Sequence, residues 1–92
     1  MRIRWTQPAL NDFQTISHRI EQERNLHTAN RVCRNIYDAL PTLRRHPHSG
    51  RPGTKEGTRE LVISTSPYVA TYRLSVDAVE ILHIWHGAQD WH

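Results

Sequence analysis

Apolar residues recur every three or four positions in two stretches of the first half of the chain, which is the spacing of one face of an α-helix. The first stretch predicts a helix over about 7–23, with Thr6 placed to cap it and Pro8 in its first turn. The second stretch runs from Ala29 to Leu43 after a short polar bend. A short connection favours an antiparallel helical hairpin, and its two apolar stripes need a common surface to cover.

The second half of the chain has the character of β-structure. Residues 46–58 contain two prolines and three glycines without hydrophobic periodicity, which marks a loop. Segments rich in Val, Ile, Thr and Tyr follow, and they predict strands at Arg59–Thr65, Tyr68–Leu74 and Ala78–Trp85. Because the connections between them are short, we expect an antiparallel meander.

A further strand is predicted at the start of the chain, where Ile3 and Trp5 alternate with arginines. It can join an edge of the meander. The predicted order is therefore β-α-α-β-β-β, an α+β fold with a helical hairpin packed on one face of a twisted antiparallel sheet. The other face stays open as a binding surface. At 92 residues the chain has room for one domain, which we expect to span residues 1–92.

The charge of the chain favours acidic or phosphorylated partners. The formal net charge is +3, and 11 of the 12 basic residues are arginine, whose planar guanidinium matches carboxylate and phosphate geometry. An ordinary basic surface is the alternative, because nine acidic residues are interspersed. No apolar run is long enough to cross a membrane or to serve as a signal peptide, so we expect a cytoplasmic protein without a membrane partner.

Cysteine and histidine usage argues against disulfide and metal chemistry. The single Cys33 excludes an intramolecular disulfide and, among apolar neighbours, is expected to be a buried small hydrophobe. His46 and His48 lie in the predicted loop without an evident third ligand. We therefore expect no metal and no cofactor, and no P-loop, dinucleotide or serine-hydrolase motif is present.

A series of short motifs is specific in its order and spacing, although each alone is common. The motifs are Trp5, Asp12 with Ile16, His46-Pro47-x-x-Gly50, Arg59-Glu60-Leu61, Pro67-Tyr68, Tyr72-Arg73, and Ile81-x-x-Ile84-x-His86. Together they resemble the RelE/ParE toxins of type II toxin–antitoxin systems, over nearly the whole chain. The resemblance implies the fold above, a growth-inhibiting toxin associated with plasmid stabilisation, and a hetero-oligomer with a cognate antitoxin. Such a partner has a segment that is disordered when free and folds over the toxin.

Two departures from the RelE pattern indicate the ParE-like branch. RelE-type members cleave mRNA on the ribosome, whereas ParE-type members inhibit DNA gyrase. In the RelE pattern an arginine commonly follows the aromatic residue that opens the middle strand, but Val69 follows Tyr68 here. A second arginine commonly follows the last strand, but Gly87–Gln89 follow His86. We therefore expect a toxin that binds a target such as gyrase, or one that has lost strong activity.

The alternative is a RelE-like ribosome-dependent mRNA endonuclease. RNA cleavage needs a proton acceptor, a cation beside the phosphate and an acid. The candidate catalytic residues are His86, His83, Arg73 and Arg59, and the candidate base-stacking residues are Tyr68 and Trp91. His83 and His86 are three residues apart on a strand, so they should point to opposite faces unless the strand has ended or bulged.

The same residues have structural interpretations. Arg59 and Arg73 could pair with Glu60, Glu80 or Asp90 and serve only the fold. A third hypothesis is a non-toxic nucleic-acid-binding module, which the arginine excess alone suggests. It would use the arginines on and after the second helix, which otherwise form a solvated face. These are Arg31, Arg34, Arg44 and Arg45.

Overall fold

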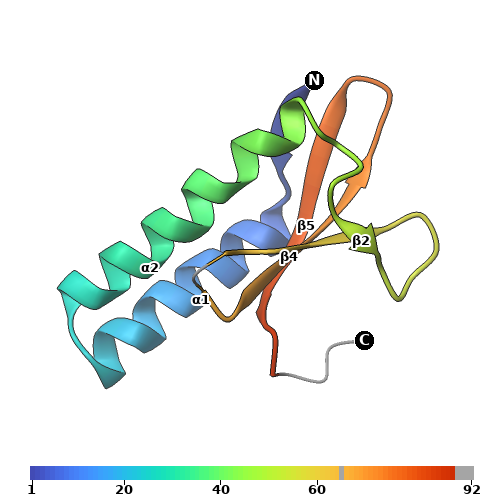
Figure 1. Cartoon of the computed structure of the whole chain (residues 1–92). Coiled ribbons are helices and arrows are strands. Elements are labelled where there is room, and N and C mark those ends of the chain that lie inside the picture. The colour runs from blue at the N-terminus through green and yellow to red at the C-terminus, as the bar shows by residue number, and fades with distance from the viewer. Residues whose placement is uncertain (65, 89–92) are drawn as a thin grey trace.

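Two antiparallel helices cover one face of a five-stranded sheet in the computed structural model, which describes residues 1–64 and 66–88 (Figure 1). The elements are β1 (Arg2–Trp5), α1 (Gln7–Glu23), α2 (Leu26–Ala39), the 3₁₀ helix η1 (Leu40–Arg44), β2 (Arg51–Pro52), β3 (Arg59–Val62), β4 (Tyr68–Leu74) and β5 (Ala78–His86). The strand order across the sheet is β1-β5-β4-β3-β2. The predicted α+β class and the packing of the hairpin on one face are confirmed.

Both helices begin at the polar caps that the sequence provides. The hydroxyl of Thr6 accepts a hydrogen bond from the Ala9 amide at 3.4 Å, so α1 starts where it was predicted. The side chain of Asn25 accepts from the Thr28 amide at 2.8 Å at the start of α2. α2 was predicted to continue to Leu43, but it ends at Ala39 and tightens into η1. Pro41 explains the change, because it has no N–H to donate to the preceding turn.

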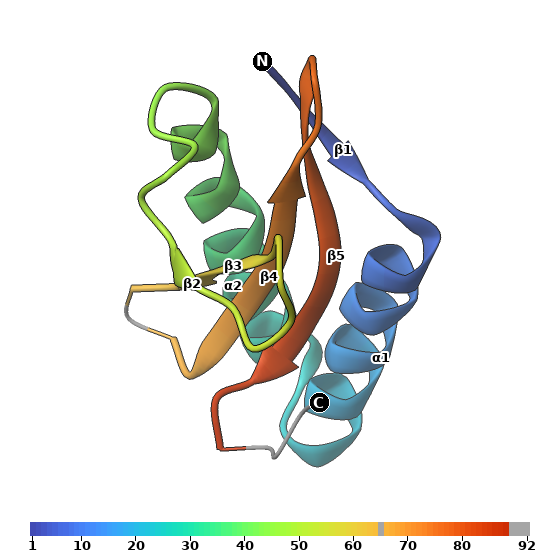
Figure 2. The same ribbon diagram turned by 90° about the vertical axis from the view of Figure 1, so that its right-hand side faces the viewer.

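The meander of β3, β4 and β5 is antiparallel, as predicted. β3 ends at Val62, earlier than predicted, and Thr65 lies outside the described residues. β2, a two-residue strand that pairs Arg51 with Glu60, was not predicted from the sequence. β1 joins the edge beside β5 and runs parallel to it (Figure 2), so the sheet is mixed, not antiparallel throughout.

The core lies between the helices and the sheet. Its largest fully buried side chains include Tyr72, Ile36, Leu40, Leu43 and Ile81. The Tyr72 hydroxyl also ties the segment before β2 to the sheet. It accepts from the Gly50 amide at 2.9 Å and donates to the Pro47 carbonyl at 2.8 Å. The segment between β2 and β3 covers part of the face that was predicted to be open, because Lys55 and Thr58 lie beside Thr71 there.

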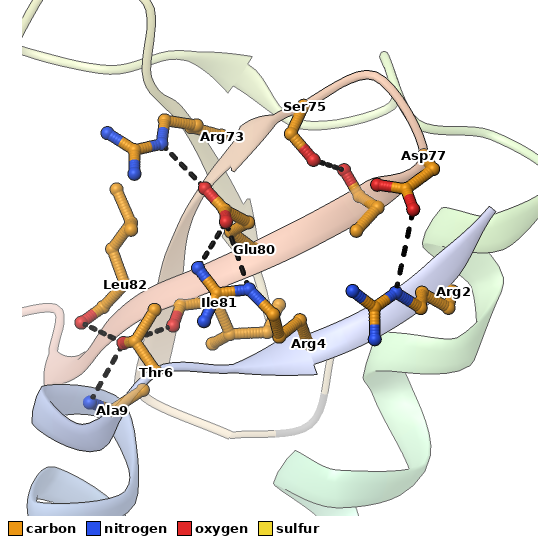
Figure 3. A network of polar contacts seen from close by, with 11 residues as sticks. Arg2, Arg4, Thr6, Ala9, Arg73, Ser75, Asp77, Glu80, Ile81 and Leu82 are labelled. Carbon is orange, nitrogen blue, oxygen red and sulfur yellow. Dashed lines mark hydrogen bonds and ion pairs between the residues drawn. The ribbon is translucent and has the colours of Figure 1, made fainter.

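β5 has a bulge beside the point where β1 ends and α1 begins. Tyr72 pairs with Ile81 and Thr71 pairs with His83, which leaves Leu82 as an extra residue in β5. Thr6 follows β1 and bonds the strand through its amide and its hydroxyl, at 3.1 and 2.6 Å from the Ile81 carbonyl (Figure 3). This contact attaches the start of α1 to β5 and brings the helix against the end of that strand.

Candidate functional site

Arg73 is engaged in an ion-pair network on the face of the sheet away from the helices. Its Nε lies 2.8 Å from Oε1 of Glu80 (Figure 3). Glu80 also binds Arg4 on the neighbouring strand β1, where the distance from Arg4 Nε to Glu80 Oε2 is 3.0 Å. Hydrogen bonds from Arg4 and then Arg73 lower the pKa of Glu80 from its ordinary value. Arg73 therefore forms the ion pair with Glu80 that its structural interpretation predicted.

Arg59 lies on the opposite face from Arg73. It pairs in register with Tyr72, the residue before Arg73, and successive residues of a strand point to opposite faces. Its Nη2 donates to the carbonyl of His48 at 3.1 Å. Its Nε is buried and has no hydrogen-bond partner among the described residues. Arg59 therefore supports the segment before β2.

His83 and His86 point to opposite faces, as the strand period predicted. His83 pairs with Thr71 and holds its Nδ1 3.0 Å from Oδ2 of Asp12 on α1. The same carboxylate oxygen accepts from the Ile84 amide at 3.0 Å, so Asp12 fixes both the imidazole and the backbone beyond the bulge. The ring of His86 packs edge-on against Tyr68, with centroids 5.4 Å apart.

A cavity of about 340 Å³ lies beside His83. Lys55 and Thr58 reach it from the segment between β2 and β3, and Thr71 and Leu82 line it from the sheet. The sequence prediction gave no site role to Lys55, and it noted Asp12 only as part of the family motif. No local signal connects either to His83, because the contacts depend on how a loop and a helix fold onto the sheet.

The predicted base-stacking residues are placed differently. Tyr68 is 4% exposed, and its hydroxyl accepts from Arg19 Nη2 at 3.0 Å. Trp91 lies outside the described residues. A groove of about 510 Å³ next to Tyr68 is lined by Arg19, Arg24 and Arg31, which the helical hairpin brings to the end of the molecule near His86. Sequence periodicity predicted the hairpin but not this grouping of arginines.

The four candidate catalytic residues do not come together in one site. His83 and Arg73 lie on the face away from the helices, while Arg59 and His86 lie on the helical face.

Cys33, expected to be buried, is half-buried, and burial raises the pKa of its thiol. Within residues 1–64 and 66–88, no group of three His, Cys, Asp or Glu side chains is placed to hold a metal ion. In the same ranges no helix has the length and apolar character needed to cross a bilayer.

Comparison with known proteins identifies the fold and the family. The chain superposes on a structure described as the chromosomal ParDE TA system from P. aeruginosa, with a TM-score of 0.87 and 24% identity over 94% of this chain and 95% of that one. It also superposes on the toxin–antitoxin complex RelBE2 from Mycobacterium tuberculosis, with a TM-score of 0.59 and 26% identity over 92% and 95% of the two chains. The fold is thus that of the RelE/ParE toxins.

Sequence comparison narrows this class to one family. A family model described as the ParE toxin of type II toxin-antitoxin system, parDE, matches residues 3–91. The chain is 44% identical over 90 residues to "Putative toxin Y4kP" of Sinorhizobium fredii (strain NBRC 101917 / NGR234), covering 98% of this chain and 92% of that protein. The chain belongs to the ParE toxin family of type II toxin–antitoxin systems, and the predicted RelE/ParE membership is confirmed.

Proposed function

We propose that this toxin arrests growth by binding a protein target such as DNA gyrase, without cutting RNA, and that a cognate antitoxin neutralises it. One observation carries the proposal: the candidate catalytic side chains lie on two faces of the sheet. Cleavage at a single phosphate needs its base, cation and acid within hydrogen-bond reach of one substrate position. The membership in the ParE family supports the same choice.

The ion pairs strengthen this argument. The carboxylate of Glu80 already offsets the charge of Arg73, with Oε1 2.8 Å from Arg73 Nε, so a phosphate would have to compete with it or displace it. Tyr68 offers little surface for stacking on a base because it is buried under α1. A binding function requires no such rearrangement.

A specific observation favours ribosome-dependent mRNA cleavage as the second candidate. His83, oriented by Asp12, lines the same cavity as Lys55, so a candidate base and a cation border one space on the face away from the helices. This pair differs from the set expected from the sequence, which combined the histidines with Arg73 and Arg59. It gives the nuclease hypothesis a defined test.

The proposed antitoxin partner has its own support. The two similar structures are described as a ParDE system and a RelBE2 complex, which pair a toxin with an antitoxin. This chain exposes large apolar side chains that such a partner would cover, and its net charge of +3 favours an acidic one. The exposed apolar side chains include Leu10, Tyr37 and Val62.

Two assays with the purified chain test the proposal. The first measures supercoiling of relaxed plasmid by gyrase with increasing toxin, and the second measures cleavage of mRNA on translating ribosomes. We expect inhibition of supercoiling that the antitoxin reverses, and uncut mRNA. Cleaved mRNA with unaffected gyrase would contradict the proposal.

Variants separate the two candidates in cells. The proposal predicts that His83→Ala and Lys55→Ala toxins still arrest growth. Loss of arrest in both variants, with folding and antitoxin binding retained, would favour the nuclease.

A further inference from the structure

The outer edge of β1 presents backbone groups that point away from the sheet. The amides of Arg2 and Thr6 donate to β5, at 3.3 Å to the Asp77 carbonyl and 3.1 Å to the Ile81 carbonyl. In a parallel pair, alternate residues direct their N–H and C=O groups toward the partner strand. The backbone groups of Ile3 and Trp5 therefore point outward. Among the described residues they have no hydrogen-bond partner, and β1 is the last strand of the sheet on this side (Figure 2).

The other edge of the sheet is poorly suited to strand addition. β2 has two residues, and one of them is Pro52, which has no N–H. β1 has four residues and no proline. An added strand would therefore pair with β1.

The two sides of the β1 edge differ in chemistry. Arg2 and Arg4 lie on the face away from the helices, with side chains 65% and 43% exposed. On the helical face, the Trp5 ring stacks on Tyr37 of α2 with centroids 6.2 Å apart. Tyr37 is 57% exposed, so an aromatic surface continues outward from the edge. On one side an incoming strand would meet the exposed parts of these two arginines, which pair with Asp77 and Glu80 of the same chain, and on the other side an apolar surface.

The charges of Arg2 and Arg4 favour a different protein over a second copy of this chain as the source of the added strand. If β1 of two copies paired, the arginines of both strands would share one face, and like charges on neighbouring strands repel. A strand that alternates acidic and apolar residues would instead place carboxylates beside Arg2 and Arg4. Its apolar residues would lie against Trp5 and Tyr37.

We propose that the outer edge of β1 binds an extended segment of the antitoxin in which acidic and apolar residues alternate. The inference rests on the proposed antitoxin partner and specifies where and how that partner is held. The segment adds a sixth strand to the five-stranded sheet. Its backbone bonds the outward groups of Ile3 and Trp5.

Residue-resolved amide exchange tests the pairing directly. The full chain is compared alone and in complex with its full-length cognate antitoxin, with complex formation checked by size-exclusion chromatography. We expect the Ile3 and Trp5 amides to exchange at least about tenfold more slowly in the complex, because they gain hydrogen bonds. The Arg2 amide is the internal control, since it already bonds to β5 in the free chain.

The outcomes distinguish the inference from the proposed function. A stable complex in which Ile3 and Trp5 exchange as fast as in the free chain would overturn the β1 assignment and leave the antitoxin partner standing. Absence of any complex would overturn both. Slowed exchange at both positions supports both.

A charge reversal provides a second test. Arg2 is largely exposed, and its Nε is 4.0 Å from Asp77, so Arg2→Glu perturbs the fold little. We expect about fivefold weaker antitoxin binding at low salt and a smaller difference at high salt. The matched control is Arg24→Glu, which makes the same charge change at the hairpin turn, at the other end of the helices (Figure 1). An equal loss in both variants would overturn the assignment to β1.

Discussion

The Tyr72 hydroxyl is the main polar link between the sheet and the segment before β2, and Tyr72→Phe removes only that oxygen. The Tyr72 side chain is fully buried. Its hydroxyl serves two backbone groups, the Gly50 amide at 2.9 Å and the Pro47 carbonyl at 2.8 Å. Phenylalanine keeps the ring packing and leaves both groups without this partner.

The magnitude follows from the burial of these two groups. Gly50 is buried, so its amide cannot form a replacement hydrogen bond with water. The loss of this hydrogen bond therefore accounts for most of the fall in the free energy of unfolding. Pro47 is half-buried, and its carbonyl can regain part of its bonding from solvent. An unsatisfied buried group costs about 1–3 kcal/mol, so we expect the free energy of unfolding to fall by roughly 2 kcal/mol. In a domain of this size that corresponds to a Tm lower by about 8–16 °C.

Equilibrium urea unfolding, followed by tryptophan fluorescence, measures the change. The matched control is Tyr37→Phe, because Tyr37 is 57% exposed and its variant should remain within about 0.5 kcal/mol of the parent chain. If Tyr72→Phe and Tyr37→Phe unfold at the same urea concentration with equal slopes, the hydroxyl does not anchor the segment and the reasoning fails.

Three further predictions concern single side chains. Because the pKa of Glu80 is lower in the folded chain than its ordinary value of 4.5, ionised Glu80 stabilises the fold at pH values above 4.5. This contribution is lost as the pH falls through the folded-state pKa. Glu80→Gln should therefore lose stability less steeply on acidification, and parallel curves of unfolding free energy against pH would contradict this. Asp12→Ala should cost about 1–2 kcal/mol because the Ile84 amide loses its acceptor, whereas Asp12→Asn should recover most of it; urea unfolding distinguishes them. Burial raises the pKa of Cys33, so Ellman's reagent should label the folded chain more slowly than the urea-unfolded chain, and equal rates would refute a protected thiol.

Periodicity located the helices and the meander because each element buries one continuous apolar face. Other features depend on contacts between distant segments. Alternation at Ile3 and Trp5 indicates a strand but not its direction, and pairing with β5 makes it parallel. β2 is too short and too rich in proline to show a pattern. The change from α2 to η1 preserves the burial of Leu43, so the apolar spacing alone did not reveal it.

The candidate site was predictable where strand geometry alone decides it. The period of a strand placed His83 and His86 on opposite faces. The partner of Arg73 was limited to three acidic residues, and the register of β4 on β5 selects Glu80. Asp12 was noted as part of a family motif, but its bond to His83 required the packing of α1 on β5.

If this toxin stops growth at a protein target in DNA metabolism, as proposed, DNA synthesis should fail before protein synthesis, and pulse-labelling distinguishes the two. The chain is induced without its antitoxin, and the synthesis of DNA and of protein is followed separately in the arrested cells. We expect an early loss of DNA synthesis while mRNA remains intact. An early loss of protein synthesis with cut mRNA would contradict the proposal and favour a nuclease built on His83 and Lys55.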